Sequence, residues 1–299
     1  MTEPAAPRPA ATVILLRPGA AAGAPEVFLV RRGEGAAFMG GAHVFPGGRV
    51  DPADATVPAA GDAAAFAARL GEEAAETTLA VGAAAARELF EEAGALLARD
   101  VRTGADPDLA DPARRARLSA ARRALAKRET TFRAFLEGEG LAVDLGALHF
   151  FARWVTPEVE PRRFDARFFL AACPAGAEPV HDEAEVFEGV WLEPAEALRR
   201  ADRGEIALPP PTLWNLLDLA PLARVEDALA AADARTVVVF RPRARATAAG
   251  QIVLVLAGDP DYDRDGFDAT EPPLEAQRRF LLEGTRWVAR RGGGGRPGR

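Results

Sequence analysis

Residues 87–94 read Arg87-Glu88-Leu89-Phe90-Glu91-Glu92-Ala93-Gly94, and this segment decides how the rest of the sequence is interpreted. At about 100° per residue, a helix places Glu88, Glu91 and Glu92 within an arc of about 100° on one face. The apolar residues of the segment fall on another arc and can pack inward. Gly94 fits the position just past the helix, where a left-handed residue often ends it.

Three carboxylates on one helix face repel one another, and a hard divalent cation would remove that repulsion. Mg²⁺ takes oxygen ligands and usually keeps waters and substrate phosphate oxygens in its shell. Arg87 lies one turn from Glu91 and can orient a carboxylate by a charge-assisted hydrogen bond. The alternative is a solvated acidic face, which these eight residues alone leave open.

A glycine-rich turn upstream favours the metal interpretation. Phe45-Pro46-Gly47-Gly48 is followed by Asp51 and Asp54. Two consecutive glycines let the main chain approach a phosphate or a metal ligand closely. We therefore expect the turn and the acidic helix to form one site.

Together the two segments resemble the signature of the Nudix hydrolases. That signature has a glycine, five residues, a glutamate, seven residues, and then Arg-Glu-apolar-x-Glu-Glu-x-Gly-apolar. Gly48 matches the first glycine, Asp54 stands in place of the glutamate, and residues 87–95 match the second half residue by residue. The seven-residue gap is here 32 residues long, from 55 to 86.

A signature split in this way is similar to the Nudix branch that includes the mammalian peroxisomal acyl-CoA diphosphatases. Residues 38–45 and 154–158 resemble that branch too. The resemblance implies an α/β fold, an α/β/α sandwich around a mixed sheet with helical insertions and a small β-rich C-terminal extension. The expected divisions are a disordered tail at 1–10, a Nudix hydrolase domain at 11–222 with insertions at about 55–80 and 98–140, the extension at 223–290, and a disordered tail at 291–299.

The resemblance also assigns roles to the acidic helix. Glu91 and Glu92 are implied as metal ligands, and Glu88 as a third ligand or the catalytic base. Gly48 offers its carbonyl oxygen to the metal, and Arg87 orients the carboxylates. The implied cofactor is Mg²⁺ or Mn²⁺.

Glu185 is a further catalytic candidate. It ends the acidic run 182–185, ahead of Trp191. Many Nudix relatives place a glutamate there that reaches a metal or acts as the base. A simple loop carboxylate is the alternative, and both stay open.

Substrate binding is less clearly encoded. The CoA diphosphatase signature has an arginine, a small residue, a second arginine and then Phe-Pro-Gly-Gly, but the second arginine is Ala37 here. Arg162 and Arg163 are expected to bind the diphosphate or a 3′-phosphate instead, or else to be surface arginines. His43 either contacts substrate or packs in its loop. The substrate-binding candidates are Arg32, His43, Phe45, Gly47, Arg162 and Arg163.

Hydrophobic periodicity and turn residues predict the remaining elements. Strands are expected at 12–16, 26–32, 42–45, 149–155, 164–172, 185–192, 236–241, 251–257 and 278–287. Helices are expected at 62–75, 78–93 with Thr78 as N-cap, 111–127, 129–137, 194–201, 212–220 and 223–233. The first of these helices either covers the fold or acts as a lid. We expect the arginines of 111–127 to be solvated, and the aspartate-rich stretch 259–266 to be a surface turn.

Composition limits the class of protein. The 299 residues carry a net charge of −7, which argues against nonspecific nucleic-acid binding. No run of 18 apolar residues suggests a membrane span. The single cysteine, Cys173, is expected to be a small buried residue in a reducing compartment. The chain ends in Pro297-Gly298-Arg299 rather than the peroxisomal Ser-Lys-Leu.

These observations lead to one functional hypothesis and two rivals. The first is a cytoplasmic metal-dependent diphosphatase with CoA or acyl-CoA as favoured substrate, giving 3′,5′-ADP and (acyl-)phosphopantetheine. The rivals are an ADP-ribose or NAD(H) diphosphatase, and a Nudix module that senses a nucleotide without cleaving it. The expected partner is a small nucleotide-type diphosphate, without nucleic acid or membrane, and a homodimer is left open.

Overall fold

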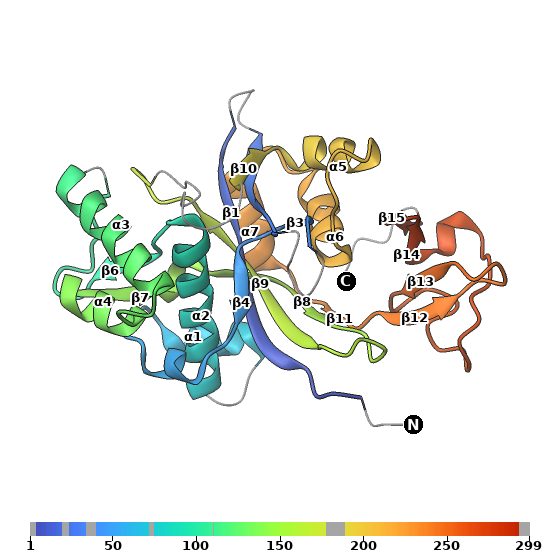
Figure 1. Ribbon diagram of the computed structural model, residues 1–299, viewed down its shortest axis with the longest axis horizontal. Helices are drawn as coiled ribbons and strands as arrows, with labels where there is room; N and C mark the ends of the chain where they lie inside the picture. The colour runs from blue at the N-terminus through green and yellow to red at the C-terminus, as the bar shows by residue number, and fades with distance from the viewer. Residues whose placement is uncertain are drawn as a thin grey trace.

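A computed structural model describes residues 4–19, 24–33, 40–71, 75–109, 111–177 and 189–292. Its centre is a mixed eight-stranded sheet with strand order β10-β2-β1-β9-β8-β11, in which β3 pairs with β2 and β4 with β1 (Figure 1). The strands are β1 (Arg8–Pro18), β2 (Pro25–Arg31), β3 (His43–Val44), β4 (Gly47–Arg49), β8 (His149–Val155), β9 (Phe164–Ala172), β10 (Gly189–Leu192) and β11 (Val239–Phe240).

The central strand β1 is buried on both faces, which is why it reads as a continuous apolar run. Val13 and Leu15 belong to one hydrophobic core, and Ile14 and Leu16 belong to another. The first core is covered by α1 (Ala63–Leu70), α2 (Ala75–Ala93), α3 (Pro112–Ala126) and α4 (Phe132–Glu139). The second is covered by α5 (Pro194–Asp202), α6 (Pro210–Leu219) and α7 (Val225–Ala234). The α/β/α sandwich is therefore confirmed.

The long insertions contain strands as well as helices. A small sheet with order β5-β7-β6 joins β5 (Ala59–Ala60), β7 (Leu141–Asp144) and β6 (Ala98–Asp100). It ties the start of the first insertion to both ends of the second. The helices expected in the insertions are present, and the strands were not expected because each is too short for its periodicity to be recognised in the sequence.

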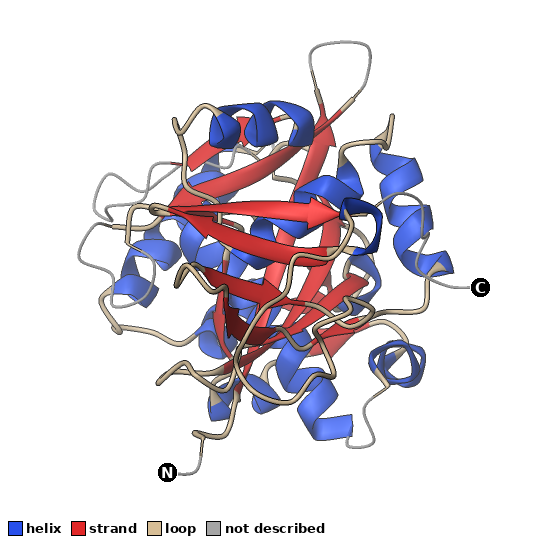
Figure 2. Ribbon diagram, turned by 90° about the vertical axis from the view of Figure 1, so that its right-hand side faces the viewer, coloured by secondary structure: helices blue, strands red, loops and turns tan. Residues whose placement is uncertain are grey.

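The C-terminal extension is confirmed as an antiparallel sheet with order β12-β13-β14-β15, seen from its own side in Figure 2. Its strands are β12 (Arg243–Ala246), β13 (Ile252–Val255), β14 (Arg278–Glu283) and β15 (Arg286–Arg291). The single strand expected at 278–287 is a hairpin, because Gly284 has a positive φ of 62° and turns the chain.

Several boundaries differ from those expected. Arg8, Pro9 and Ala10 are not a disordered tail but pair with β9 as the start of β1. Helix α2 begins at Ala75, so Thr78 is a buried residue inside the helix and not its N-cap. Helix α7 packs on β8 and β9, and β11 pairs with β8, so both belong to the central sandwich. A domain boundary at 222 stays a prediction.

The thiol of Cys173 lies half-buried against the first core. Burial raises the pKa of this thiol to about 11, so it stays protonated at neutral pH. Separately, none of the helices within the described ranges has the length and apolar character needed to cross a bilayer.

The aspartate-rich stretch is not a simple surface turn, because two of its carboxylates are buried. Asp259 and Asp261 have 4% and 0% of their surface exposed. The guanidinium of Arg279 on β14 donates to both, with Nε 2.8 Å from Asp259 Oδ2 and Nη2 3.1 Å from Asp261 Oδ2. Asp261 also accepts hydrogen bonds from the backbone and hydroxyl groups of Thr270. This cluster fixes the loop 256–277 to the C-terminal sheet.

We predict that Arg279→Met lowers the free energy of unfolding by about 3–5 kcal/mol, because it leaves two buried carboxylates without their cation. Urea denaturation followed by tryptophan fluorescence measures the change. The control is Arg290→Met on β15, whose ion pair with Glu283 is 3.7 Å long and solvent-exposed. Equal stability of the two variants would contradict the structural role of the cluster.

Candidate active site

Packing of α2 fixes the direction of its carboxylates. Leu89 and Phe90 are fully buried, and the ring of Phe90 stacks on that of Phe135 at 5.1 Å between centroids. Because this side of the helix is held in the core, the opposite side must face away from it. That opposite side carries Glu88, Glu91 and Glu92, as the periodicity predicted.

Arg87 is the centre of a partly buried ion-pair network. Its Nε lies 2.8 Å from Asp54 Oδ1 and its Nη2 lies 3.0 Å from Asp54 Oδ2. Its Nη1 donates to Glu88 Oε1 at 2.8 Å and to Glu91 Oε2 at 3.2 Å. The bidentate contact with Asp54, which is 2% exposed, fixes the guanidinium so that it can hold the two glutamates.

The diglycine turn is packed closely against β1 on one side and the carboxylate of Glu88 on the other, which leaves no room for a side chain on either glycine. A Cβ on Gly48 would lie 2.5 Å from Glu88 Oε1, and a Cβ on Gly47 would lie 2.6 Å from Ala11 O. The backbone N–H of Gly47 donates to Glu92 Oε2 at 2.9 Å. The turn on β4 and the acidic helix thus form one site.

The site holds more negative charge than Arg87 balances. Burial is the main effect on the pKa of Glu91. Together with the negative charges of Glu88 and Asp54, it outweighs the attraction of Arg87 and raises the pKa of Glu91 to about 7. Burial raises the pKa of Glu88 as well. Burial also disfavours the charged form of Arg87, which by itself would lower the pKa of this side chain. The hydrogen bond to Asp54 and the charges of the neighbouring carboxylates outweigh this effect and raise the pKa of Arg87. An added cation would stabilise the ionised glutamates.

The donor set fits a hard divalent cation. Glu88, Glu91 and Glu92 supply carboxylate oxygens, and the backbone of Gly48 lies close to the carboxylate of Glu88. Within the described residues, no group of three acidic, histidine or cysteine side chains is already gathered as a metal-ligand cluster. The glutamates instead contact Arg87 and Gly47, so a cation would compete with these two partners.

Arg122 caps the C-terminal end of α2, a role that we did not expect for the arginines of 111–127. Its Nε donates to Glu91 O at 2.7 Å and its Nη2 donates to Glu92 O at 2.7 Å. The side chain is largely buried, so this arginine is not solvated. A cation at a helix C-terminus stabilises the unpaired carbonyl groups.

A cavity of about 720 Å³ opens at the site and continues toward the C-terminal sheet. Glu88, Glu92, Gly47 and Gly48 line one end. The other end is lined mainly by apolar side chains from four parts of the chain: Trp154, Phe164, Phe168, Pro209, Pro210, Pro211, Leu254 and Trp287.

The structure brings most of the substrate-binding candidates to this cavity. Arg32, Phe45 and Arg162 line it, and Arg163 lines a smaller pocket beside it. His43 lies on β3, where its backbone N–H donates to Ala207 O, and it is not among the lining residues. Glu185 lies outside the described residues.

Comparisons with known proteins agree with this geometry. Residues 55–219 match the model of the NUDT19 Nudix domain. This protein belongs to the Nudix hydrolase family. It is therefore a hydrolase that acts on diphosphate bonds, and Nudix hydrolases generally need divalent metal ions.

Individual relatives support the same branch of the Nudix family. The chain is 30% identical over 271 residues to the acyl-coenzyme A diphosphatase NUDT19 of Gallus gallus, covering 74% of this chain and 70% of that protein. It is 31% identical to the Homo sapiens protein of the same name, covering 68% of this chain and 62% of that one. A crystal structure of a Nudix hydrolase from Alicyclobacillus acidocaldarius is 33% identical, with a TM-score of 0.59, over 75% of this chain and 96% of that one.

We predict that Arg122→Met lowers the free energy of unfolding of this Nudix hydrolase by about 2 kcal/mol, because two charge-assisted hydrogen bonds are lost. Turnover should fall as well, since the last turn of α2 carries Glu91 and Glu92. Chemical denaturation and steady-state kinetics measure the two effects. Arg123→Met is the matched control, because Arg123 is the exposed neighbour on the same helix. Identical behaviour of the two variants would contradict the capping role.

Proposed function

We propose that this Nudix hydrolase cleaves the diphosphate of CoA or acyl-CoA, with Mg²⁺ or Mn²⁺ as cofactor, to give 3′,5′-ADP and (acyl-)phosphopantetheine. The observation that carries the proposal is the continuity of the acidic site with a long, mainly apolar cavity. A diphosphate bound at Glu88 and Glu92 leaves room there for a long substituent. The names of the Gallus gallus and Homo sapiens relatives support the same substrate class.

The proposed mechanism assigns one task to each group. A divalent cation bound there would supply positive charge for the diphosphate oxygens and would lower the pKa of a bound water. Glu91 and Glu92 would hold the cation, together with Gly48. Glu88 is a ligand or takes the proton of the attacking water, and Glu185 stays the alternative base. Arg87, fixed by Asp54, keeps the carboxylates in position and does not touch substrate.

Other features support the setting of this reaction. The single cysteine and its protonated thiol fit a cytoplasmic enzyme in a reducing compartment. The net charge of −7 fits a small-molecule substrate and not a nucleic acid.

A second candidate is an ADP-ribose or NAD(H) diphosphatase. The observation that favours it is Ala37, which replaces the second arginine of the CoA diphosphatase signature. A nucleotide sensor without catalysis is disfavoured, because the ion-pair network still positions the glutamates.

Hydrolysis of a substrate panel tests the proposal. The purified protein is assayed with Mg²⁺ and then Mn²⁺ on CoA, acetyl-CoA, a long-chain acyl-CoA, ADP-ribose, NADH and a diadenosine polyphosphate, with products resolved by mass. We expect 3′,5′-ADP and the matching phosphopantetheine from the CoA compounds, and no product in excess EDTA. Release of AMP from ADP-ribose or NADH alone would replace the CoA proposal with the second candidate.

We predict that Glu91→Gln lowers turnover at least ~100-fold, because one of the charges that hold the cation is lost. Without metal, thermal stability should be equal or higher at pH 8. Since the pKa of Glu91 is raised to about 7 in the folded protein, folding is disfavoured as pH rises from the unfolded value of 4.5 through 7, and glutamine removes that penalty.

The control for this variant is Glu137→Gln on α4, a conservative change on the surface remote from the cavity. Full turnover by Glu91→Gln would exclude this residue as a metal ligand. A large drop in its melting temperature would assign it a structural role instead.

A further inference from the structure

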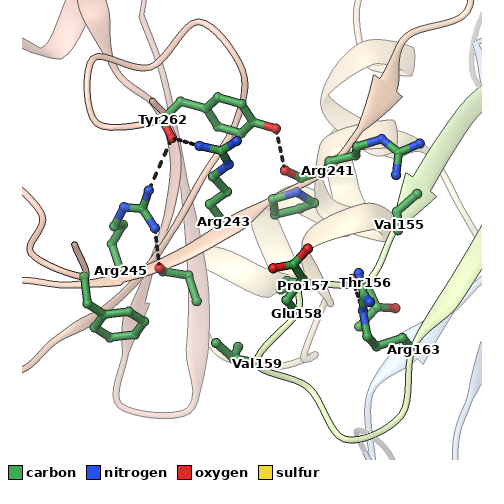
Figure 3. Close-up of a pocket in the computed structure, with 13 residues that line it drawn as sticks. Val155, Thr156, Pro157, Glu158, Val159, Arg163, Arg241, Arg243, Arg245 and Tyr262 are labelled. Carbon is green, nitrogen blue, oxygen red and sulfur yellow. Dashed lines mark hydrogen bonds between the residues drawn. The ribbon is translucent and has the colours of Figure 1, made fainter. Parts of the chain in front are cut away.

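A second, strongly basic pocket lies between the β8–β9 turn and the C-terminal sheet (Figure 3). Its volume is about 390 Å³. Four arginines line it, namely Arg163, Arg241, Arg243 and Arg245, together with one carboxylate, Glu158. The lining therefore carries an excess of three positive charges.

Main-chain carbonyl groups hold several of these guanidinium groups without neutralising them. Arg245 donates to the carbonyl oxygens of Ala244, Tyr262 and Arg264. Arg163 donates to those of Thr156 and Ala5. Such acceptors carry no net charge, so both cations remain available to an anion.

Arg245 provides the strongest indication that a ligand is missing. Its side chain is only 8% exposed, and its Nε lacks a hydrogen-bond partner among the described residues. A buried donor without an acceptor is costly, and a buried guanidinium without a counter-charge is costlier still. An anion entering the pocket would reduce both costs.

The strand β12 and the loop that faces it make the pocket rigid. Arg243 and Arg245 are two residues apart on β12, so their side chains leave the same face. The guanidinium of Arg243 lies 4.5 Å from the ring centroid of Tyr262 and donates to Tyr262 O at 2.8 Å. The Tyr262 hydroxyl donates to Arg241 O at 3.0 Å, which ties the loop to the start of the strand. The ion pair of Arg243 with Asp263 is 3.5 Å long and largely exposed.

The arginine pocket adjoins the active-site cavity. Val155, Thr156, Pro157 and Pro242 line both spaces. A molecule bound in the large cavity therefore lies beside the arginine pocket.

We propose that this pocket binds a phosphate monoester dianion. The planar guanidinium of an arginine can donate two hydrogen bonds to a pair of phosphate oxygens. Three excess positive charges also exceed the single negative charge of a carboxylate ligand. One source is the substrate itself: resting on the proposed function, the group is the 3′-phosphate of CoA. The other source is a separate phosphate-bearing molecule. ADP-ribose and NADH carry no phosphate monoester, so the pocket would select CoA in place of the arginine that is absent at Ala37.

The first experiment compares kcat/KM for CoA and 3′-dephospho-CoA. We expect wild type to prefer CoA by about 10- to 100-fold, as charge-assisted hydrogen bonds allow. In Arg241→Ala/Arg243→Ala this ratio should fall toward one through a higher KM for CoA. Arg290→Ala, an arginine of the same sheet outside the pocket, should retain the ratio. Arg241→Gln/Arg243→Gln replaces the alanine variant if its circular dichroism shows misfolding.

The second experiment titrates inorganic phosphate into metal-free wild type and the double variant by calorimetry. Phosphate binding by wild type alone, without a preference for CoA, would support a separate phosphate ligand. The proposal would be overturned if wild type and the double variant had the same ratio of kcat/KM for CoA and 3′-dephospho-CoA and bound phosphate equally. If wild type hydrolyses neither CoA compound, the proposed function fails, and the calorimetric comparison still decides whether the pocket binds phosphate.

Discussion

The bidentate ion pair between Arg87 and Asp54 is the constraint on which the site depends. It joins the segment after the diglycine turn to the acidic helix, across 33 positions of the chain. Most Nudix signatures have only seven residues between these halves. Here an inserted helix separates them. A buried contact, instead of a short connecting segment, must therefore fix the distance between the two halves. Asp54 is almost completely buried, and the low local dielectric strengthens its attraction to Arg87.

The sequence predicted those parts of the fold that follow from local periodicity. The strands expected at 12–16 and 164–172 and the carboxylate face of the helix at 78–93 all follow from residue spacing, and the structure has β1, β9 and α2 at these places. The family resemblance supplied the α/β/α arrangement, since periodicity alone does not order strands in a sheet. The roles of individual site residues remain predictions, although the structure brings Glu88, Glu92, Gly47 and Gly48 to one cavity.

Contacts between side chains that lie far apart in the sequence could not be predicted from residue spacing. Arg122 resembles the other arginines of its helix, and only the packing of α3 on α2 shows that it caps a helix end. Likewise, Asp259 and Asp261 lie in a polar segment typical of a surface turn. They are buried because Arg279, about 20 residues later, compensates their charge. Asp54 is a similar case: the sequence placed it at the glutamate position of the signature, and only the structure shows that it is the partner of Arg87.

The hydrogen bonds from Arg122 to the end of α2 limit which parts of this enzyme can be removed. Insertions between conserved segments are often regarded as separable additions that could be deleted to recover a minimal catalytic core. In this chain the second insertion, through Arg122, binds two carbonyl groups in the last turn of the helix that carries Glu91 and Glu92. A shortened protein lacking residues 98–140 would expose Phe90 and release that helix end. The catalytic helix and this insertion therefore form a single structural unit.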